Sequence, residues 1–435
     1  MAQSQHYSQF IENKHFRQES AGFDYVCRNP ALFDYQKASV EWALRRGKAL
    51  IAKDTGLGKT MDELEFAQAV ADETESPVLL LAPLCVSHQI NREADRFGYE
   101  SRIVRCQDDV VGGINICNYE MIHKLDFSAF SGIVLDEASI LKGIDGKIRR
   151  QLTESAQRIP YRLCATATPA PNDFMEIGAQ SEFLGIMTQV EMLATFFIHD
   201  GADTAKWRLK GHGKQKFFEW LATWSIIMRD PSDYGFQPKP ALPLLDIEQI
   251  TIETEVTDGL FATVAQSLSE RLNARRDTLT ERCQKAAEIV SKLEGPVLLW
   301  CGLNAEGDLL QSLIPGSVQV AGSDTDANKE SRLIGFSGGE HPILITKAKV
   351  AGFGMNWQHC RQMVFVGLSD SFEQYYQAVR RCWRHGQKHG VKVWVITADS
   401  EGAVVENIRR KQIQADTMMS EMAKIASQFF QGFEQ

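Results

Sequence analysis

The segment Asp54–Thr60, DTGLGKT, follows a short apolar run and precedes a helix-like stretch. A glycine-bearing turn between a strand and a helix points successive backbone N–H groups and the positive end of the helix at phosphates. In such a turn Lys59 is placed to reach the terminal phosphates of ATP, and Thr60 to hold Mg²⁺. The residues predicted to form this nucleotide site are Thr55, Gly56, Gly58, Lys59 and Thr60.

The match to the strict phosphate-loop pattern is imperfect, because Lys53 stands where that pattern has its first glycine. For this segment alone, a chance glycine-rich entry to a helix is an alternative interpretation.

A pair of acids, Asp136 and Glu137, ends the apolar run GIVL. If this run is a buried parallel strand, both carboxyl groups lie at the carboxyl edge of the sheet, where open α/β folds bind ligands. There Asp136 is expected to coordinate Mg²⁺ through water, and Glu137 to orient or deprotonate the attacking water. An acidic pair at the end of an isolated strand would not indicate a nucleotide site. Here the pair follows a phosphate-loop segment on another strand, which favours such a site.

The segment 377–387, QAVRRCWRHGQ, supplies two arginines that are three residues apart. On a helix, Arg381 and Arg384 share a face, so both guanidinium groups are predicted to reach a γ-phosphate bound by the other half of the chain. An arginine supplied across a cleft stabilises the charge of the transition state only when the cleft closes. A basic solvated helix is the alternative, and it also fits Arg380, His385 and Lys388.

These residues are positioned by apolar runs of strand length, each followed by a stretch long enough for a helix. Runs that are apolar at nearly every position suit strands buried on both faces, and their alternation with helices is typical of parallel sheets. The sequence therefore predicts an α/β protein with two tandem domains. The predicted strands are 49–53, 78–83, 114–119, 132–138 and 161–168 in the first half, and 296–301, 318–322, 342–347, 362–368 and 391–397 in the second.

Between the halves the pattern changes to aromatic, helix-like stretches such as FFEWLATWSIIMRD, followed by a cluster of prolines. A helix is also predicted over Tyr35–Arg46, ending at Gly47. The predicted organisation is an N-terminal extension (1–30), a first domain (31–235) with a helical insert from about residue 186, a linker (236–250), and a second domain (251–435) that ends in a helix over about 401–426.

Composition and charge limit the class of protein. The 435 residues are too many for one core, and a net charge of −9 argues against a protein that coats nucleic acid by bulk charge. The polar N-terminus and the absence of a long apolar run predict no membrane span, and nine scattered cysteines are expected to be buried reduced thiols in a cytoplasmic protein. One local basic run, 206–216, is either a solvated loop or a nucleic-acid contact through Lys206, Arg208 and Lys210.

Over about residues 32–397 the motifs resemble, in order, the blocks of superfamily-two helicases, and specifically the Swi/Snf-like group of DNA translocases. The blocks LFDYQKASVEWAL, DTGLGKT, DEASILKG, TATPAPND, AGFGMNW and QAVRRCWRHGQ carry this resemblance. The group's phosphate loop also lacks the strict first glycine, which removes most of the doubt about Lys53. The resemblance implies two tandem RecA-like domains, each a mostly parallel sheet flanked by helices.

The resemblance also implies roles for single residues. Gln36 matches the reader of the adenine base, and Gly354 and Gln377 fall in the last two blocks, on the nucleotide side. Asn118 lies in a block that touches the tracked strand, and Lys142, the lysine that trails the Walker B block DEASILKG, is expected to contact nucleic acid. Ala348 stands where the group commonly has a threonine on the nucleic-acid backbone, so the neighbouring Lys347 and Lys349 are expected to contact phosphates instead.

The expected function is an ATP-dependent motor that moves on double-stranded DNA, with ATP and Mg²⁺ bound between two lobes. The resemblance, not the residues, implies duplex tracking. A strand-separating helicase on DNA or RNA shares every one of these blocks and stays an alternative. Another is an ATP-gated nucleic-acid-binding subunit of a restriction or repair complex, in which a protein partner holds the specificity.

Overall fold

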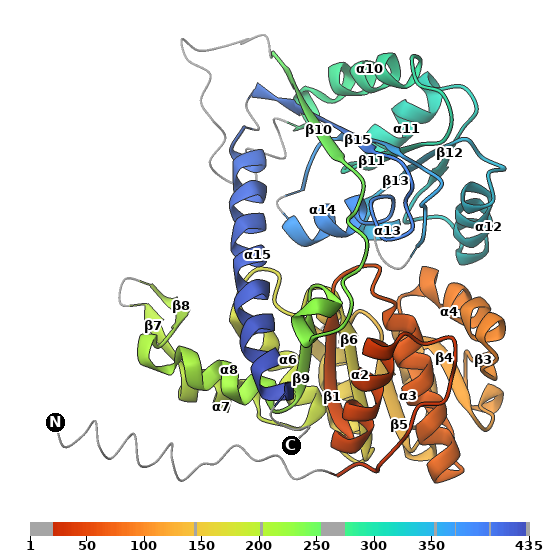
Figure 1. The fold of residues 1–435 in the computed structure, drawn as a ribbon. Coiled ribbons are helices and arrows are strands. Elements are labelled where there is room, and N and C mark those ends of the chain that lie inside the picture. The colour runs from red at the N-terminus through yellow and green to blue at the C-terminus, as the bar shows by residue number, and fades with distance from the viewer. Residues whose placement is uncertain are drawn as a thin grey trace. The chain divides into compact units, whose positions relative to one another are not determined.

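The computed structural model describes residues 21–142, 146–200, 203–253, 275–351, 355–369, 371–399 and 402–431. The chain forms two units. The first contains Met1–Ala82, Asn91–Pro238 and Thr417–Gln435, and the second contains Pro83–Ile90 and Lys239–Asp416. Each unit is built around its own parallel sheet (Figure 1).

The first unit has a seven-stranded sheet in the order β3-β4-β2-β5-β6-β1-β9, in which every pairing is parallel. This order places β1 between β6 and β9, and β5 between β2 and β6. The carboxyl ends of these strands therefore meet at one edge. The strands are β1 (Lys48–Lys53), β2 (Val78–Ala82), β3 (Ser101–Ile103), β4 (Ile114–Asn118), β5 (Gly132–Leu135), β6 (Tyr161–Thr166) and β9 (Ser225–Met228).

Helices connect these strands, as parallel pairing requires. They are α2 (Asp34–Arg46), α3 (Lys59–Thr74), α4 (Leu84–Phe97), α5 (Gly146–Ala156), α6 (Ile177–Leu184), α7 (Gln189–Phe196) and α8 (Lys214–Ala222). The predicted helix over 35–46 is confirmed. It ends at Gly47, whose φ of 73° is left-handed and whose N–H bonds the carbonyls of Ala43 and Leu44.

The insert that was predicted to be helical also contains β structure. Strands β7 (Phe197–Asp200) and β8 (Asp203–Leu209) form an antiparallel hairpin between α7 and α8. Strand β9, which lies inside the stretch interpreted as helical, joins the main sheet beside β1. The aromatic residues between these elements are core residues, with Phe217, Trp220 and Trp224 fully buried.

The second unit has a six-stranded, all-parallel sheet in the order β10-β15-β14-β11-β13-β12. Its strands are β10 (Leu245–Ile252), β11 (Val297–Cys301), β12 (Ser317–Val320), β13 (Ile343–Thr346), β14 (Gln362–Val366) and β15 (Val391–Ala398). The helices are α10 (Leu279–Val290), α11 (Asn304–Leu313), α12 (Asp326–Ser337), α13 (Ala348–Ala351) and α14 (Phe372–Val379). Strand β10 begins inside the segment predicted as a linker.

Both faces of this second sheet are covered, which explains the continuous apolar runs in the sequence. Along β11, Leu298 and Trp300 pack into one buried cluster, whereas Val297, Leu299 and Cys301 pack into another. Because side chains of a strand alternate between faces, two clusters fed by alternate residues mean that neither face is solvated. The prediction of an α/β fold with two RecA-like domains is confirmed.

The chain ends in α15 (Gly402–Gln431), a helix of 30 residues. Its first half places Val404 and Ile408 in the core of the second unit. Its second half belongs to the first unit, where Met418 and Met422 lie among the core residues. The apolar residues of this helix therefore pack within the chain, and residues from Thr417 onward belong to the first unit rather than to the predicted second domain.

Candidate functional site

The phosphate loop connects β1 to α3 in the first unit. Strand β1 ends at Lys53, and the helix begins at Lys59. Gly56 and Gly58 have φ values of 87° and 74°, a left-handed conformation that residues with a Cβ rarely adopt, so both positions require glycine. The Nζ of Lys59 lies 3.0 Å from the carbonyl oxygen of Lys53 and donates to it. The lysine is thus held over the loop that is predicted to bind phosphates.

Gln36 lies against this loop, as the resemblance implied. Its Nε2 donates to the carbonyl of Gly58 over 2.9 Å, while its Oε1 accepts from the backbone N–H of Phe33. A Cβ at position 58 would lie 2.6 Å from Nε2, which is a second reason for a glycine there. The amide of Gln36 is therefore positioned from both ends at the entrance to the phosphate loop.

Lys53 has a structural role at the position of the missing glycine. Its Nζ donates to Oδ2 of Asp62 over 2.7 Å, both side chains are almost fully buried, and the ammonium lies 5.0 Å from the centre of the Tyr35 ring. Burial raises the pKa of Asp62 to about 6, even though Lys53 opposes that shift. The pair ties the end of β1 to the first turn of α3, the two elements that flank the phosphate loop.

We expect Lys53→Met to lower the free energy of unfolding by about 3–5 kcal/mol, because it leaves the Asp62 carboxyl group buried without its cation. Urea denaturation of the variant, of Asp62→Asn and of the double variant measures the coupling. The exposed pair Lys285–Glu288 is the matched control, for which Lys285→Met is expected to cost under about 1 kcal/mol. A cost for Lys53→Met as small as that of the control would contradict a stabilising role for the buried pair.

Asp136 and Glu137 directly follow β5 and are both buried. The hydroxyl of Tyr119 donates to the backbone carbonyl of Asp136 over 2.7 Å. Glu137 has a φ of 52°, which is uncommon for a residue with a side chain and often marks a functional site. Its Oε2 accepts a long hydrogen bond, 3.5 Å, from Oγ1 of Thr166 at the end of β6. The structure thereby connects the two acids to the TATPAPND block.

Burial and repulsion by neighbouring acids raise the pKa of Asp136 and of a further acid near it. Burial, and then the neighbouring Glu137 carboxylate, raise the pKa of Asp136 to about 7, while the ammonium of Lys59 opposes the shift. A further acid that the sequence did not single out, Glu63 on α3, has its pKa raised well above the usual range by burial and by Asp136. A cation bound at this edge of the sheet would therefore stabilise the charged forms of Asp136 and Glu63.

The residues at this edge fit Mg²⁺ bound together with nucleotide phosphates. Asp136 offers a carboxylate, Thr60 a hydroxyl at the start of α3, and Glu63 two carboxyl oxygens to which no N–H group or hydroxyl donates in the described part of the chain. Among the described residues, no group of three or more His, Cys, Asp or Glu side chains is arranged to hold a metal alone. Mg²⁺ typically uses one or two carboxylates, water and phosphates. This arrangement of residues resembles the nucleotide site of the superfamily-two ATPases.

In the second unit, the side chains of Arg381 and Gln377 are hydrogen-bonded to each other. Nη2 of Arg381 donates to Oε1 of Gln377 over 2.7 Å, and Nη1 donates to the carbonyl of Met355. Arg384 reaches the same carbonyl at 3.5 Å and is half-buried, whereas Arg381 is buried. The prediction that both arginines lie on a helix is wrong, because α14 ends at Val379 and the chain continues through turns. They share a common backbone acceptor rather than a helical face.

Lys347 and Lys349 follow β13 at the carboxyl edge of the second sheet. They line a cavity of about 200 Å³ together with Arg275, Trp300 and Tyr375. The last three residues were not predicted, because Arg275 precedes α10 without a motif, Trp300 lies within the apolar strand β11, and Tyr375 lies on α14 outside the matched block. The cavity combines cations with aromatic surface, which suits a phosphate-bearing chain.

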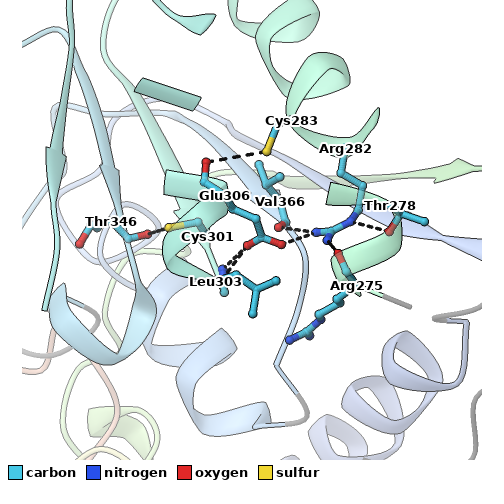
Figure 2. Close-up of polar contacts among 10 residues, drawn as sticks. Arg275, Thr278, Arg282, Cys283, Cys301, Leu303, Glu306, Thr346 and Val366 are labelled. Carbon is cyan, nitrogen blue, oxygen red and sulfur yellow. Dashed lines mark hydrogen bonds and ion pairs between the residues drawn. The ribbon is translucent and has the colours of Figure 1, made fainter. Parts of the chain in front are cut away.

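A buried ion pair fixes the walls of this cavity (Figure 2). Nη1 of Arg282 lies 2.7 Å from Oε1 of Glu306, and both side chains are fully buried. Arg282 also donates to the carbonyl of Val366 at the end of β14. Gly367 has a φ of 104°, and a Cβ there would lie 2.6 Å from Nη1 of Arg282, so this turn also requires glycine. The pair joins α10, α11 and the end of β14 at one edge.

The other predicted contacts have visible structural roles or lie outside the described residues. Oδ1 of Asn118 caps the turn that follows β4, and Lys142 pairs with Glu176 at 3.5 Å. Lys210 donates to the carbonyls of Ala194 and Thr195 at the end of α7. Arg208 is exposed on β8. Gly354 and the side chain of Lys206 lie outside the described part of the structure.

Comparison with known proteins gives matches to one family. Residues 35–196 match the model of the SNF2-related domain. The CHD3-type chromatin-remodeling factor CHR7 of Arabidopsis thaliana is 23% identical over 205 residues, which are 40% of this chain and 17% of that protein. The SWI/SNF-related matrix-associated actin-dependent regulator of chromatin subfamily A-like protein 1 of Xenopus tropicalis is 29% identical over 163 residues, 34% of this chain and 17% of that protein.

A solved structure, the Sulfolobus solfataricus SWI2/SNF2 ATPase core in complex with dsDNA, is similar over 92% of this chain and 95% of its own, at 16% identity and a TM-score of 0.41. The sequence matches confirm the resemblance to the Swi/Snf-like group, which lies in the match of residues 35–196 to the SNF2-related domain. The chain spans 16–17% of the length of the curated relatives it matches.

Composition predicted the absence of a membrane span and buried, reduced cysteines. No helix in the described residues is long and apolar enough to cross a membrane. The eight cysteines whose side chains are described are free thiols, and all of them except Cys106 are buried. Burial raises the pKa of several of these thiols, including that of Cys283 to about 12, so they are inert rather than reactive.

Proposed function

We propose that this chain is an ATP-dependent motor that translocates on double-stranded DNA in the cytoplasm. The observation that carries the proposal is the arrangement at the carboxyl edge of the first sheet. Lys59 follows β1, Glu137 follows β5, and Thr166 ends β6 with its hydroxyl on the Glu137 carboxylate. The SNF2-related domain supports the same function.

In the proposed mechanism, Lys59 binds the terminal phosphates of ATP, and Thr60 and Asp136 hold Mg²⁺. The bound ion neutralises phosphate charge and helps to orient the nucleotide. Glu137 orients the attacking water and accepts its proton. Because Thr166 contacts Glu137, a change at the catalytic carboxylate is transmitted to the loop that follows β6.

The second unit is proposed to supply Arg381 and Arg384 to the γ-phosphate when ATP closes a cleft between the units. The two units would close when ATP binds and would separate after ATP is hydrolysed. Alternating grip on a phosphate backbone would convert this cycle into steps along DNA. Such grip is independent of sequence and strongly dependent on salt.

The decisive experiment measures steady-state ATP hydrolysis without nucleic acid and with single-stranded DNA, duplex DNA or RNA. The proposal expects the largest stimulation with duplex DNA, and displacement of a triplex-forming third strand during hydrolysis. Hydrolysis that no nucleic acid stimulates would refute the motor. Release of a duplex strand without triplex displacement would instead favour a strand-separating helicase.

The cavity of the second unit gives a separate prediction about DNA grip. Replacing both Lys347 and Lys349 by alanine is expected to reduce the slope of log affinity against log salt by about 1 to 2, since each lost phosphate contact on duplex DNA removes about 0.9. Fluorescence anisotropy of labelled duplex DNA across a salt series measures this slope. The exposed Lys285 and Lys292 on and beside α10 are the control pair. Equal slopes for the wild type and the variant of Lys347 and Lys349 would remove the cavity from the DNA path.

A further inference from the structure

Glu63 is a buried acid that the proposed mechanism does not use. It lies on α3, four residues after Lys59 and three after Thr60. Residues three and four apart on a helix lie on the same face, so the side chain of Glu63 shares a face with the phosphate-binding lysine and the predicted Mg²⁺ ligand. Its charge acts on Asp136, Lys59 and Glu137. The carboxyl group therefore belongs to the same edge of the sheet as the nucleotide site.

The hydrogen bonding of Glu63 is incomplete. Its side chain is fully buried, neither carboxyl oxygen accepts a hydrogen bond from an N–H group or a hydroxyl among the described residues, and its one close polar neighbour there is another acid, Asp136. Burying a carboxyl group without a donor is costly, and native structures rarely retain such a group without a function.

Two other acids on α3 show how this helix normally satisfies a buried carboxylate. Asp62 is paired with Lys53. Glu65 accepts hydrogen bonds from Tyr25, Tyr99 and Asn29, which anchor the segment before α2. Glu63 instead faces another acid, Asp136, and neither a cation nor a hydroxyl donates to it among the described residues, so a structural role of the same kind does not explain it.

We propose that Glu63 is an outer-shell ligand of the nucleotide-bound Mg²⁺, accepting hydrogen bonds from water molecules that the ion keeps. This inference rests on the proposed function, because it requires that the site bind ATP together with Mg²⁺. Contact through water agrees with the absence, among the residues described, of three acids arranged to bind a metal directly. Mg²⁺ gives up its water reluctantly, and groups that orient its ligands strongly affect affinity.

The test measures Mn²⁺, a paramagnetic substitute for Mg²⁺, bound in the presence of saturating non-hydrolysable adenylyl imidodiphosphate. Electron paramagnetic resonance of the free ion gives the affinity. Glu63→Gln is expected to weaken Mn²⁺ binding by about 10- to 100-fold, the usual cost of losing an outer-shell partner. Binding of the nucleotide in EDTA is expected to stay within about twofold, since Glu63 acts on the hydrated ion.

Glu73→Gln is the matched control, because it makes the same charge change at an exposed position of the same helix. Glu63→Asp keeps the carboxylate and is expected to give an intermediate Mn²⁺ affinity, which a loss of packing alone would not do. Unchanged Mn²⁺ affinity in Glu63→Gln would overturn the inference, and so would an equal loss of nucleotide binding in EDTA. A wild-type chain that binds no nucleotide would instead refute the proposed function.

Discussion

Replacing Glu137 by glutamine is expected to lower ATP hydrolysis by about 10² to 10⁴-fold while ATP binding is retained, because a positioned general base contributes about that much. Glutamine keeps the shape of the side chain and one oxygen that can accept from Thr166, so the position after β5 is preserved. It removes the group that orients the attacking water and accepts its proton. Single-turnover hydrolysis and fluorescent-nucleotide binding measure the two properties separately.

The control for this prediction is Glu120→Gln, which removes an exposed carboxylate from the same unit. Its hydrolysis rate is expected to match that of the wild type. If Glu137→Gln hydrolyses ATP as fast as this control, the chain senses nucleotide without using Glu137, and the alternative of an ATP-gated binding subunit becomes the better account. If the variant loses ATP binding as well, Glu137 has a structural role at the left-handed position.

Most of the fold could be predicted because strands of a buried parallel sheet are continuous apolar runs in the sequence. All ten apolar runs are strands, since both faces of each sheet are covered by helices. Three strands of the parallel sheets, β3, β9 and β10, were missed because they do not stand out in this way, and the hairpin strands β7 and β8 were missed as well. Strand β3 has only three residues, and β10 lies at an edge with most of its side chains exposed. The residues of β9 are apolar, but they follow directly on the aromatic face of α8, where no glycine or proline separates the two patterns.

The candidate site was predictable where chemistry depends on neighbours in sequence. Lys59 follows its glycines, and Glu137 follows Asp136. The burial of Asp62 and Glu63 was not predictable, because an acid in the first turns of a helix is ordinarily a solvated residue near the positive helix end. The role of Lys53, the partner of Asp62, could not be predicted for the same reason. Only the packing of α3 against the sheet shows that Asp62 meets a buried lysine while Glu63 faces Asp136.

The two arginines of the second unit are expected to respond differently to substitution. Arg381 is buried, with hydrogen bonds to Gln377 and Met355, whereas Arg384 is half-buried and lies 3.5 Å from the same Met355 carbonyl. Arg381→Ala is therefore expected to lower both the stability of the second unit and hydrolysis. Its effect on hydrolysis alone cannot identify a contact with phosphate.

Arg384→Ala is the sharper test of the proposed arginine contact. It is expected to lower DNA-stimulated hydrolysis by about 10³-fold or more, the usual effect of removing an arginine from a transferring phosphoryl group. The melting temperature of the variant is measured alongside, so that a loss of stability is separated from a loss of the phosphate contact. Lys388→Ala, an exposed cation in the same segment, should leave the rate unchanged. Arg384→Lys should remain strongly impaired, because an ammonium does not reproduce the planar two-pronged contact of a guanidinium group. Hydrolysis at the wild-type rate in Arg384→Ala would show that the second unit supplies no catalytic contact through this residue, and DNA movement would then need another link to ATP.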